Sequence, residues 1–399
     1  MLSNEASIKQ DTMLKNAYRL VRGMNDLDAN KAKKFDFIIQ TASRLAQEFN
    51  FSHLTTPIVE YTNLFDRNLG AESDVVNKEL YRFEDKSGDV LALRPEFTAG
   101  VCRYVIENGM FQGPFPHKFF SYGPVFRYDR PQKGRYRQFN QLNFEVFGLK
   151  EHSTEICVYL NFIQTLFKKI GISDIVIKIN YLGGTEERQK YTTALFEYLQ
   201  KYKNDLSTDS QRRLTTNILR ILDSKDEADK KILVDAPKIE NYLFPENKEF
   251  LYTIKVKNNS FQIDNNLVRG LDYYSGFVFE VITNKIGATQ DAVCGGGEYN
   301  NLIEQMCGKK LSAFGFALGI ERLMEIMDEQ VLPKKIPLYC HLTDKSKFVE
   351  NARNEINFDI DFVKGLKWAN QLGADFVIFE KDGKLWQKDL STGQQNEII

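Results

Sequence analysis

Residues 139–147, FNQLNFEVF, decide the fold prediction because polar and apolar side chains alternate along them. Successive side chains of a β-strand point to opposite faces, so this stretch predicts a strand with one largely polar face. That face would carry Phe139, Gln141, Asn143 and Glu145, opposite Asn140, Leu142, Phe144 and Val146. Two interpretations are open: a solvated face of an antiparallel sheet, which is common, or the floor of a polar ligand pocket.

The segment before this strand is a basic turn. Residues 126–139 read FRYDRPQKGRYRQF, in which Asp129 is the only acid and the cations are Arg127, Arg130, Lys133, Arg135 and Arg137. The apolar stretch HKFFSYGPVF (117–126) precedes it, so a hairpin is expected here. Because the whole chain has a formal net charge of −1, a polyanion would have to be bound by such a local patch. A plain nucleic-acid-binding protein would explain the turn but not the carboxylate on the strand, and the near-neutral chain does not favour it.

Length and composition favour a soluble multidomain protein. At 399 residues, two or three domains are expected, and 42% hydrophobic with 27% charged residues is typical of globular proteins. The five cysteines form no CxxC pair and the four histidines lack metal-site spacing, so neither disulfides nor a histidine-based centre is expected. The N-terminus does not resemble a signal peptide, and no apolar run is long enough to span a membrane. A cytoplasmic location without a membrane partner is therefore expected.

Patterning divides the rest of the chain. A helix with an apolar face is expected over 31–49, and a strand pair over ELYRFED (79–85) and DVLALRPE (89–96). Residues 184–248 are charged, helical and poor in glycine, which indicates an insertion. Strands are expected to resume at FLYTIKV (250–256) and as a hairpin in LVRGLDYYSGFVFEVIT (267–283), followed by a glycine-rich turn in AVCGGGEYNN (292–301).

Three arginines are candidates for phosphate binding. The chain has neither a GxxxxGK[ST] nor a GxGxxG motif, so a nucleotide would be bound without a phosphate loop at a helix N-terminus. Arg127 ends the first strand of the hairpin, Arg269 lies in LVRGLDYY, and Arg322 begins a helix. A guanidinium binds phosphate oxygens in a fork, so three convergent arginines could hold a triphosphate. Arginines at such positions are more often solvated or paired, and that alternative stays open.

Several long segments resemble histidyl-tRNA synthetases, a family of class II aminoacyl-tRNA synthetases. They are LRPEFTAG (93–100), GPVFRYDRPQKGRYRQFNQLNFEVFGL (123–149), LVRGLDYYSGFVFE (267–280) and GFALGIERL (315–323), with RGMNDL (22–27) and TPIVEYTNLF (56–65) in the family's order. The resemblance implies an α+β fold, in which helices flank the antiparallel sheet of a class II synthetase. It implies a catalytic domain in two parts, 1–183 and 255–332, around a helical insertion at 184–254. A shortened α/β domain at 336–399 resembles the family's anticodon-binding domain.

The resemblance also implies a site for ATP. Arg127 matches the arginine on the α-phosphate, and Phe139 matches the ring that stacks on adenine. Arg135 and Arg322 match further ATP-contacting arginines, and Asp129 stands where a glutamate approaches the adenine end. Arg130 and Lys133 remain exposed in the turn and are expected to meet the acceptor end of tRNA.

For histidine, the resemblance implies that Glu96, Thr98, Gln141 and Glu145 hold the ammonium group. Arg269 matches an arginine between the histidine carboxylate and the α-phosphate, so Arg127 and Arg269 are the expected catalytic residues. The imidazole pocket is expected from Tyr273, Tyr274 and Tyr299 above the glycine run Gly295–Gly297.

The implied activity is the ATP-dependent ligation of histidine to tRNA(His) through histidyl-adenylate, with ATP and Mg²⁺ required. A homodimer is also expected, because the apolar face of helix 31–49 and Pro57 suggest the dimer of a class II synthetase. An alternative is a non-catalytic paralogue that serves as the regulatory subunit of ATP phosphoribosyltransferase in histidine biosynthesis. Such paralogues tend to lose the arginines that this chain keeps.

The chain departs from the family pattern at several positions. Asp129 is shorter than the usual glutamate, Phe97 replaces a glycine or methionine, and Asn140 replaces a frequent histidine. Glu298 and Asn300 stand where arginine and aspartate are usual, which reverses a charge beside the expected histidine pocket.

Overall fold

The computed structural model describes residues 19–66, 75–132, 134–150, 152–258, 260–285, 292–332, 338–341, 356–357, 362–371, 374 and 376–397. The chain divides into two compact units, residues 1–331 and 332–399.

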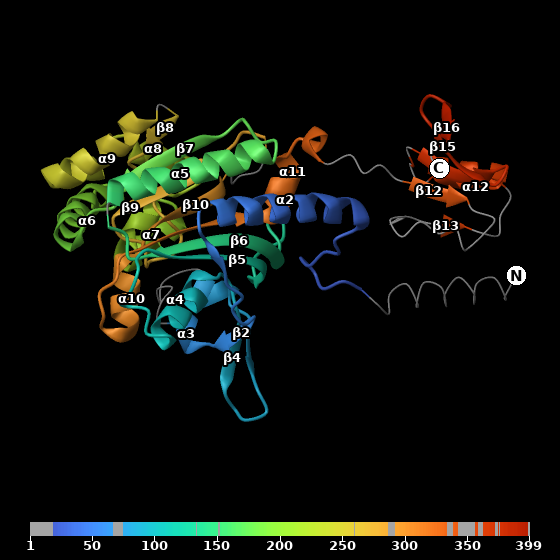
Figure 1. The fold of residues 1–399 in the computed structure, drawn as a ribbon. Helices are drawn as coiled ribbons and strands as arrows, with labels where there is room; N and C mark the ends of the chain where they lie inside the picture. Colours follow the sequence, from blue (N-terminus) through green and yellow to red (C-terminus); the bar gives the residue numbers. More distant parts are fainter. Residues whose placement is uncertain are drawn as a thin grey trace, which may run out of the picture. The chain divides into compact units, whose positions relative to one another are not determined.

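An eight-stranded sheet forms the centre of the first unit (Figure 1). Its six inner strands pair antiparallel, as the hairpin pattern predicts, whereas the short strands β1 and β8 add to the two edges in parallel. In spatial order the strands are β1 (Ser52–His53), β5 (His117–Phe126), β6 (Gln138–Phe147), β11 (Ala313–Gly319), β10 (Ala292–Glu298), β9 (Phe277–Ile282), β7 (Val176–Tyr181) and β8 (Phe261–Ile263).

Strands β5 and β6 form the predicted hairpin, with Phe126 opposite Gln138 at the turn. The polar face of β6 is not solvated, because Gln141, Asn143 and Glu145 are 8%, 2% and 0% exposed. The solvated-face interpretation is therefore wrong, and polar groups that are buried in this way require hydrogen-bonding partners or a ligand.

Helices α2 (Ala29–Glu48) and α5 (His152–Lys169) lie side by side against one face of this sheet (Figure 1). Asp28 caps α2 by accepting from the backbone N–H groups of Asn30 and Lys31, both at 3.0 Å. The apolar stripe of α2 is buried within the chain, with Phe49 just beyond the helix packed edge-on against Phe162 of α5. Helices α3 (Asn63–Asp66), α4 (Thr98–Glu107) and α10 (Asn300–Cys307) lie on the other side.

The insertion between β7 and β8 is helical, as predicted. Its elements are α6 (Thr185–Gln200), α7 (Thr208–Thr216), η2 (Ile218–Ile221), α8 (Glu227–Leu233), η3 (Ile239–Tyr242) and α9 (Pro245–Lys257). The strand expected at FLYTIKV is wrong, because these residues belong to α9. Pro245 occupies the first turn, and Leu251 and Ile254, three residues apart, are buried on one side of the helix.

Two further expectations are corrected near the end of this unit. Of LVRGLDYYSGFVFEVIT, only Phe277–Ile282 is a strand, and the described residues 264–276 form a connection without helix or strand. The glycine run Gly295–Gly297 is not a turn but lies inside β10, which pairs on both sides. Strand β11 leads directly into α11 (Ile320–Ile326), as expected, and η4 (Glu329–Val331) follows.

Two smaller sheets complete the description. The first unit also contains β2 (Val59–Tyr61), β3 (Arg82–Glu84) and β4 (Val90–Leu93), which form a three-stranded sheet beside the short π-helix η1 (Val75–Glu79). In the second unit, α12 (Phe362–Gln371) accompanies a mixed sheet of β13 (Ile356–Asn357), β12 (Leu338–His341), β14 (Phe376–Lys381), β15 (Lys384–Asp389) and β16 (Gln395–Glu397).

Candidate active site

A cavity of about 450 Å³ opens on the polar face of the large sheet. Strands β6, β10 and β11 line it from the sheet, and the connection 264–276, the start of α4 and α11 enclose its sides. Most of the site residues expected from the sequence line this cavity: Glu96, Thr98, Arg127, Asp129, Arg135, Phe139, Gln141, Arg269, Tyr273, Tyr274 and Arg322.

Glycines in two neighbouring strands make room for the charged side chains. A Cβ atom at Gly295 of β10 would collide with the guanidinium of Arg269. A Cβ atom at Gly315 of β11 would collide with the carboxylate of Glu145. The sheet therefore needs glycine here because side chains from elsewhere occupy the space above the backbone.

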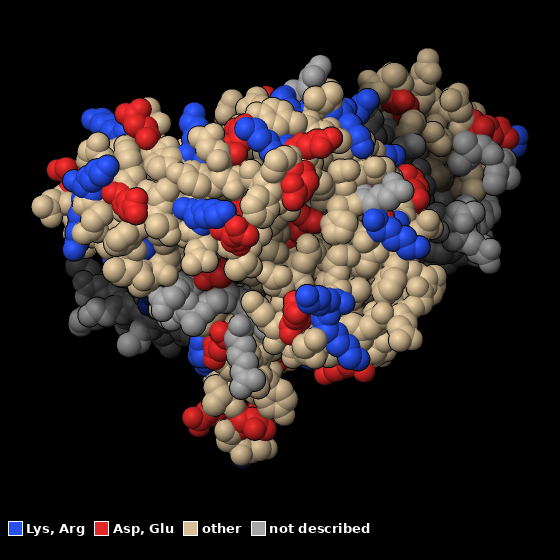
Figure 2. Space-filling view, turned by 90° about the vertical axis from the view of Figure 1, so that its left-hand side faces the viewer, with Lys and Arg blue, Asp and Glu red and all other residues tan. Residues whose placement is uncertain are grey.

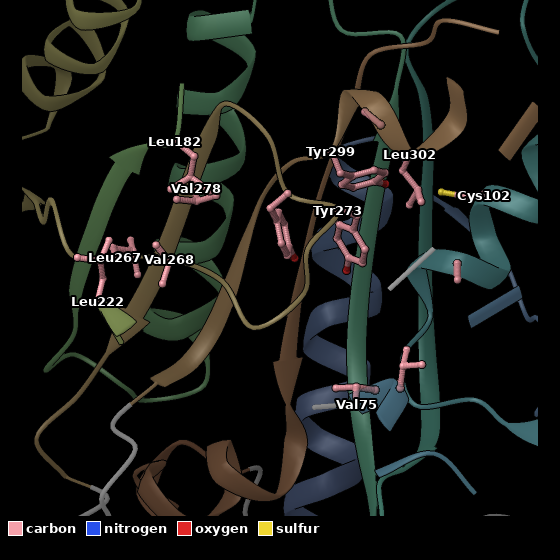
Figure 3. Close-up of a cluster of buried hydrophobic side chains, with 14 of the residues drawn as sticks. Val75, Cys102, Leu182, Leu222, Leu267, Val268, Tyr273, Val278, Tyr299 and Leu302 are labelled. Carbon is pink, nitrogen blue, oxygen red and sulfur yellow. The ribbon is translucent and has the colours of Figure 1, made fainter. Parts of the chain in front are cut away.

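Glu145 forms the deepest part of the site. Its carboxylate accepts from Thr98 Oγ1 at 2.5 Å, from Asn143 Nδ2 at 2.9 Å and from the Tyr299 hydroxyl. Burial raises the pKa of Glu145 to about 8, although these three hydrogen bonds act in the opposite direction. Neither Glu145 nor Tyr299 is among the residues that line the open cavity. Tyr273 lines it, and the centre of its ring lies 5.6 Å from the centre of the Tyr299 ring (Figure 3).

Glu96 places a second buried carboxylate near the first. Its oxygens accept from the backbone N–H groups of Thr98 at 2.5 Å and Ala99 at 2.8 Å, in the first turn of α4. Burial raises the pKa of Glu96, and these hydrogen bonds oppose the rise. Beside it, Gln141 Oε1 is buried without a hydrogen-bond partner among the described residues, so this oxygen is available to accept from a ligand.

Arginines gather at the other end of the cavity. Arg127 donates from Nε to the carbonyl oxygen of Pro95 at 3.0 Å, and its guanidinium lies 5.5 Å from the centre of the Phe139 ring. Arg322 donates to the carbonyl oxygens of Gly134 at 2.9 Å and Ala292 at 2.6 Å, and so joins the hairpin turn to β10. Burial lowers the pKa of Arg322, and the nearby charges of Arg135 and Arg127 lower it further. Three cations at close range suit a polyanion.

Arg269 lies between the two ends. Its Nη1 atom is 2.6 Å from Glu280 Oε1, and its guanidinium is 5.8 Å from the centre of the Tyr274 ring. Sequence reasoning missed Glu280, which lines the cavity from β9. The strand FVFEVI could have suggested it, because Glu280 is the only polar residue among these six and the period-2 rule puts it on the face opposite Phe279.

The other predicted residues lie outside the cavity or are held by neighbours. Asp129 is paired with Arg135, Oδ2 to Nε at 3.2 Å. Arg130 is exposed in the turn, and Lys133 lies outside the described residues. Sequence reasoning also missed three basic residues that line the cavity mouth, Lys178, Arg220 and Lys225.

The position of Glu298 in the sequence suggested that it reverses the charge of the pocket. The structure shows that it does not, because its carboxylate is bonded to His152 and to the backbone of Phe277. The Oε1 atom lies 2.8 Å from His152 Nδ1, and Oε2 accepts from the backbone N–H of Phe277 at 2.9 Å. The bond to Glu298 raises the pKa of His152. Asn300 accepts from the backbone N–H of Ala313 at 2.8 Å, so both departures are bonded within the chain.

Among the residues that the structure describes, no group of three or more His, Cys, Asp or Glu side chains is placed to hold a metal ion. The cavity carboxylates already have protein partners: Glu280 is paired with Arg269, and Glu321 accepts from Asn140. These residues do not fit a dedicated metal cage. Nor does any described helix have the length and apolar character needed to cross a membrane.

Comparison with known proteins identifies the family. The family model described as histidyl-tRNA synthetase matches residues 23–323, which include all the strands around the cavity. The chain belongs to the histidyl-tRNA synthetase family. It is 47% identical to the histidine–tRNA ligase of Wolbachia pipientis wMel, with 95% of this chain and 96% of the relative covered. It is 38% identical to that of Ehrlichia chaffeensis, with 97% of each chain covered.

A solved structure agrees with this assignment. Apo histidyl-tRNA synthetase of S. aureus aligns with a TM-score of 0.74 at 28% identity, covering 96% of this chain and 97% of that one. The class II synthetase fold expected from the sequence is thus confirmed, and the chain is an aminoacyl-tRNA synthetase. The regulatory-subunit alternative is not favoured. A Bacillus halodurans ATP phosphoribosyltransferase regulatory subunit/histidyl-tRNA synthetase aligns at a TM-score of 0.56 with only 20% identity, which shows a shared fold alone.

Proposed function

We propose that this chain joins histidine to ATP as histidyl-adenylate and then transfers the histidyl group to the 3′ end of tRNA(His). The observation that carries the proposal is the polarity of the cavity: buried carboxylates at one end and converging arginines at the other, with Arg269 between them. An amino acid with a cationic ammonium group and a nucleoside triphosphate match these two ends.

In the activation step, a carboxylate oxygen of histidine attacks the α-phosphorus of ATP, and the bond from that phosphorus to the oxygen of pyrophosphate breaks. The carboxylate is ionised at neutral pH, so no general base is needed. The difficulty is the approach of two anions, and Arg269 is placed to hold both together and to stabilise the charge that develops on phosphorus. Arg127 would bind the α-phosphate, while Phe139 stacks on adenine.

Arg322 and Arg135 would bind the remaining phosphates. Their hydrogen bonds and ion pair fix both side chains before ATP arrives: Arg322 to two backbone carbonyl groups and Arg135 to Asp129. Asp129 therefore contributes to ATP binding by orienting Arg135. Mg²⁺ supplied with ATP would offset the negative charge that develops on the leaving pyrophosphate.

The histidine site would use the opposite end. Glu96, Thr98 and the free Gln141 Oε1 atom suit the ammonium group, which donates hydrogen bonds and carries positive charge. Glu145 accepts from both Thr98 and Tyr299, and so it connects the ammonium site to the side expected to hold the imidazole with Tyr273 and Tyr274. Polar partners for the ring nitrogens would disfavour amino acids that leave those partners unpaired.

Transfer requires the terminal ribose hydroxyl of tRNA to attack the acyl carbon of the adenylate, with AMP as the leaving group. The exposed Arg130 would contact phosphates of the acceptor end. The acidic and basic side chains on the face in Figure 2 are interspersed, so a local patch would have to guide the tRNA on that side. A cytoplasmic location accords with these substrates.

A homodimer is proposed from the three-stranded sheet rather than from helix α2, whose apolar stripe is already buried. In the order β2-β4-β3, directly opposed residues share a face. One face carries Val59, Tyr61 and Phe83, which are 39%, 57% and 42% exposed, whereas Ala92 on the opposite face is fully buried. A contiguous exposed apolar face of this kind marks an interface.

The proposed activity is tested by histidine-dependent exchange of pyrophosphate into ATP, followed by charging of tRNA. The wild-type chain should exchange with histidine and not with other amino acids. Arg269→Ala should lower exchange at least about a hundredfold, because its charge acts on the transition state. Lys190→Ala, which removes an exposed ion pair to Glu186 on α6 and does not line the cavity, should leave exchange unchanged. Folded wild-type protein without exchange would refute the proposal.

A further inference from the structure

The connection between β8 and β9, residues 264–276, carries the histidine-site residues Arg269, Tyr273 and Tyr274. It contains no helix or strand, so no regular backbone ladder fixes its shape. Its polar groups must find partners on neighbouring elements, and those partners set where the three side chains stand.

Three of these partners come from the helical insertion. Arg188 of α6 donates from Nη2 to the carbonyl oxygen of Tyr274 at 2.9 Å. Asn217, which follows α7, donates from Nδ2 to Asp272 Oδ1 at 2.8 Å. These bonds reach the connection beside the two tyrosines of the histidine site.

The third partner is Arg220 of η2, whose Nη1 atom donates to the carbonyl oxygen of Gly270 at 3.1 Å. Gly270 follows Arg269 in the chain, so this bond holds the backbone next to the central cation of the site. The three bonds reach residues 270, 272 and 274, and so are spread along the functional part of the connection.

Apolar packing supports the same contact. Leu222 of the insertion belongs to one buried cluster with Leu267 and Val268, the two residues before Arg269 (Figure 3). Burial lowers the pKa of Arg188, and the charge of Asp272 opposes this change. The insertion thus contacts the connection through buried apolar side chains as well as through hydrogen bonds.

We propose that the helical insertion positions the histidine-binding segment, with Arg188, Asn217 and Arg220 as positioning residues for histidine recognition. This inference rests on the proposed function of the cavity. The ATP-binding residues Arg127 and Phe139 belong to the β5–β6 hairpin, which these three bonds do not reach. Loosening the connection should therefore weaken histidine binding and leave ATP binding intact.

The test uses Asn217→Asp in the full-length protein. The new carboxylate has nearly the shape of the amide but faces Asp272, so a hydrogen bond becomes a repulsion. The KM for histidine in pyrophosphate exchange should rise about fivefold or more, while the KM for ATP changes less than about twofold. The double variant Asn217→Asp with Asp272→Asn restores a donor and an acceptor and should bring the KM for histidine back toward wild type.

Gln211→Ala is the matched control. Gln211 also has an amide side chain and lies in α7, just before Asn217, but it donates to the carbonyl oxygen of Leu206 inside the insertion. Its removal should leave both KM values unchanged. Arg188→Ala provides an independent variant that should also raise the KM for histidine selectively, because Arg188 holds Tyr274 and, unlike Arg220, does not line the cavity.

Two results would overturn the inference while the proposed function stands: a wild-type KM for histidine in folded Asn217→Asp and Arg188→Ala, or equal changes in both KM values. Failure of the double variant to recover, with a wild-type KM in Asp272→Asn alone, would likewise assign the loss to something other than the Asn217–Asp272 bond. The single variant controls for the action of the Asp272 charge on Arg188. Absence of exchange in the wild-type protein would instead refute the proposed function itself.

Discussion

Glu145 is a carboxylate enclosed entirely by the protein, with three hydrogen-bond donors around it. In the ligand-free protein its pKa of about 8 keeps it largely protonated at neutral pH. A bound cation or a donating ring nitrogen would favour the ionised form.

The raised pKa has a consequence for stability. Because the pKa of Glu145 in the folded protein exceeds the 4.5 that is ordinary for a glutamate, the folded protein binds a proton that the unfolded chain has released. This contribution to the free energy of unfolding is fully present below about pH 4.5 and is lost as the pH rises through about 8. Urea unfolding should be measured at pH values across that window. The free energy of unfolding should fall more steeply with rising pH for the wild type than for Glu145→Gln. Parallel curves for the two proteins would contradict this.

Glu298 shows what sequence reasoning about single residues can and cannot reach. Its position beside the glycine run was predicted correctly, but the direction of its carboxylate was not. Alternation along β10 does not reveal that His152, far away in the chain, supplies the partner. Gln141 shows the opposite case, since the period-2 rule alone placed it on the cavity face.

Strand β10 is the element on which the site depends most directly. Gly295→Ala should abolish pyrophosphate exchange, because the added methyl group would displace the guanidinium of Arg269 from its place above the strand. Exchange activity and the thermal midpoint should both be measured. Gly308→Asn is the control: this surface position has a φ of 75° with no atom near its Cβ, and asparagine tolerates such backbone. Wild-type activity in Gly295→Ala would show that Arg269 can function from another position.

Elements were predictable where their hydrophobic period was clear. The β5–β6 hairpin, the helix at α2 and the strand-to-helix junction at α11 all follow from periods of 2 or 3.6. FLYTIKV was misassigned because its β-branched residues favour a strand while burial of Leu251 and Ile254 follows the helical period. LVRGLDYY was misassigned because its shape depends on bonds to the insertion, which no local pattern records.

At the scale of the whole molecule, the exposed face of the three-stranded sheet predicts assembly. Phe83→Lys should convert the proposed dimer to a monomer, because it places a charge on this apolar face. Sedimentation velocity measures the change directly. Phe196→Lys is a fair control, since Phe196 on α6 is 40% exposed, close to the 42% of Phe83. A dimer that survives Phe83→Lys would place the interface elsewhere.

The contribution of the insertion to the cavity was also beyond prediction from sequence. Arg220 and Lys225 line the mouth, yet they stand in a charged helical stretch whose residues are usually solvated. Their position follows from how the insertion folds back onto the connection 264–276. Long-range packing of this kind leaves no periodic mark in a sequence.

The glycines of β10 and β11 under the cavity, Gly295–Gly297 and Gly315, form a glycine floor. This floor limits which substitutions could make the enzyme resistant to a competitive inhibitor. A side chain at Gly295 or Gly315 that blocked the inhibitor would also collide with Arg269 or Glu145, so the resistant enzyme would lose activity. Gly296 and Gly297 lie too close to backbone atoms of neighbouring strands to accept a side chain. Viable resistance should therefore arise at the rim, in residues such as Lys225 of the insertion, and inhibitors confined to the floor should be the hardest to evade.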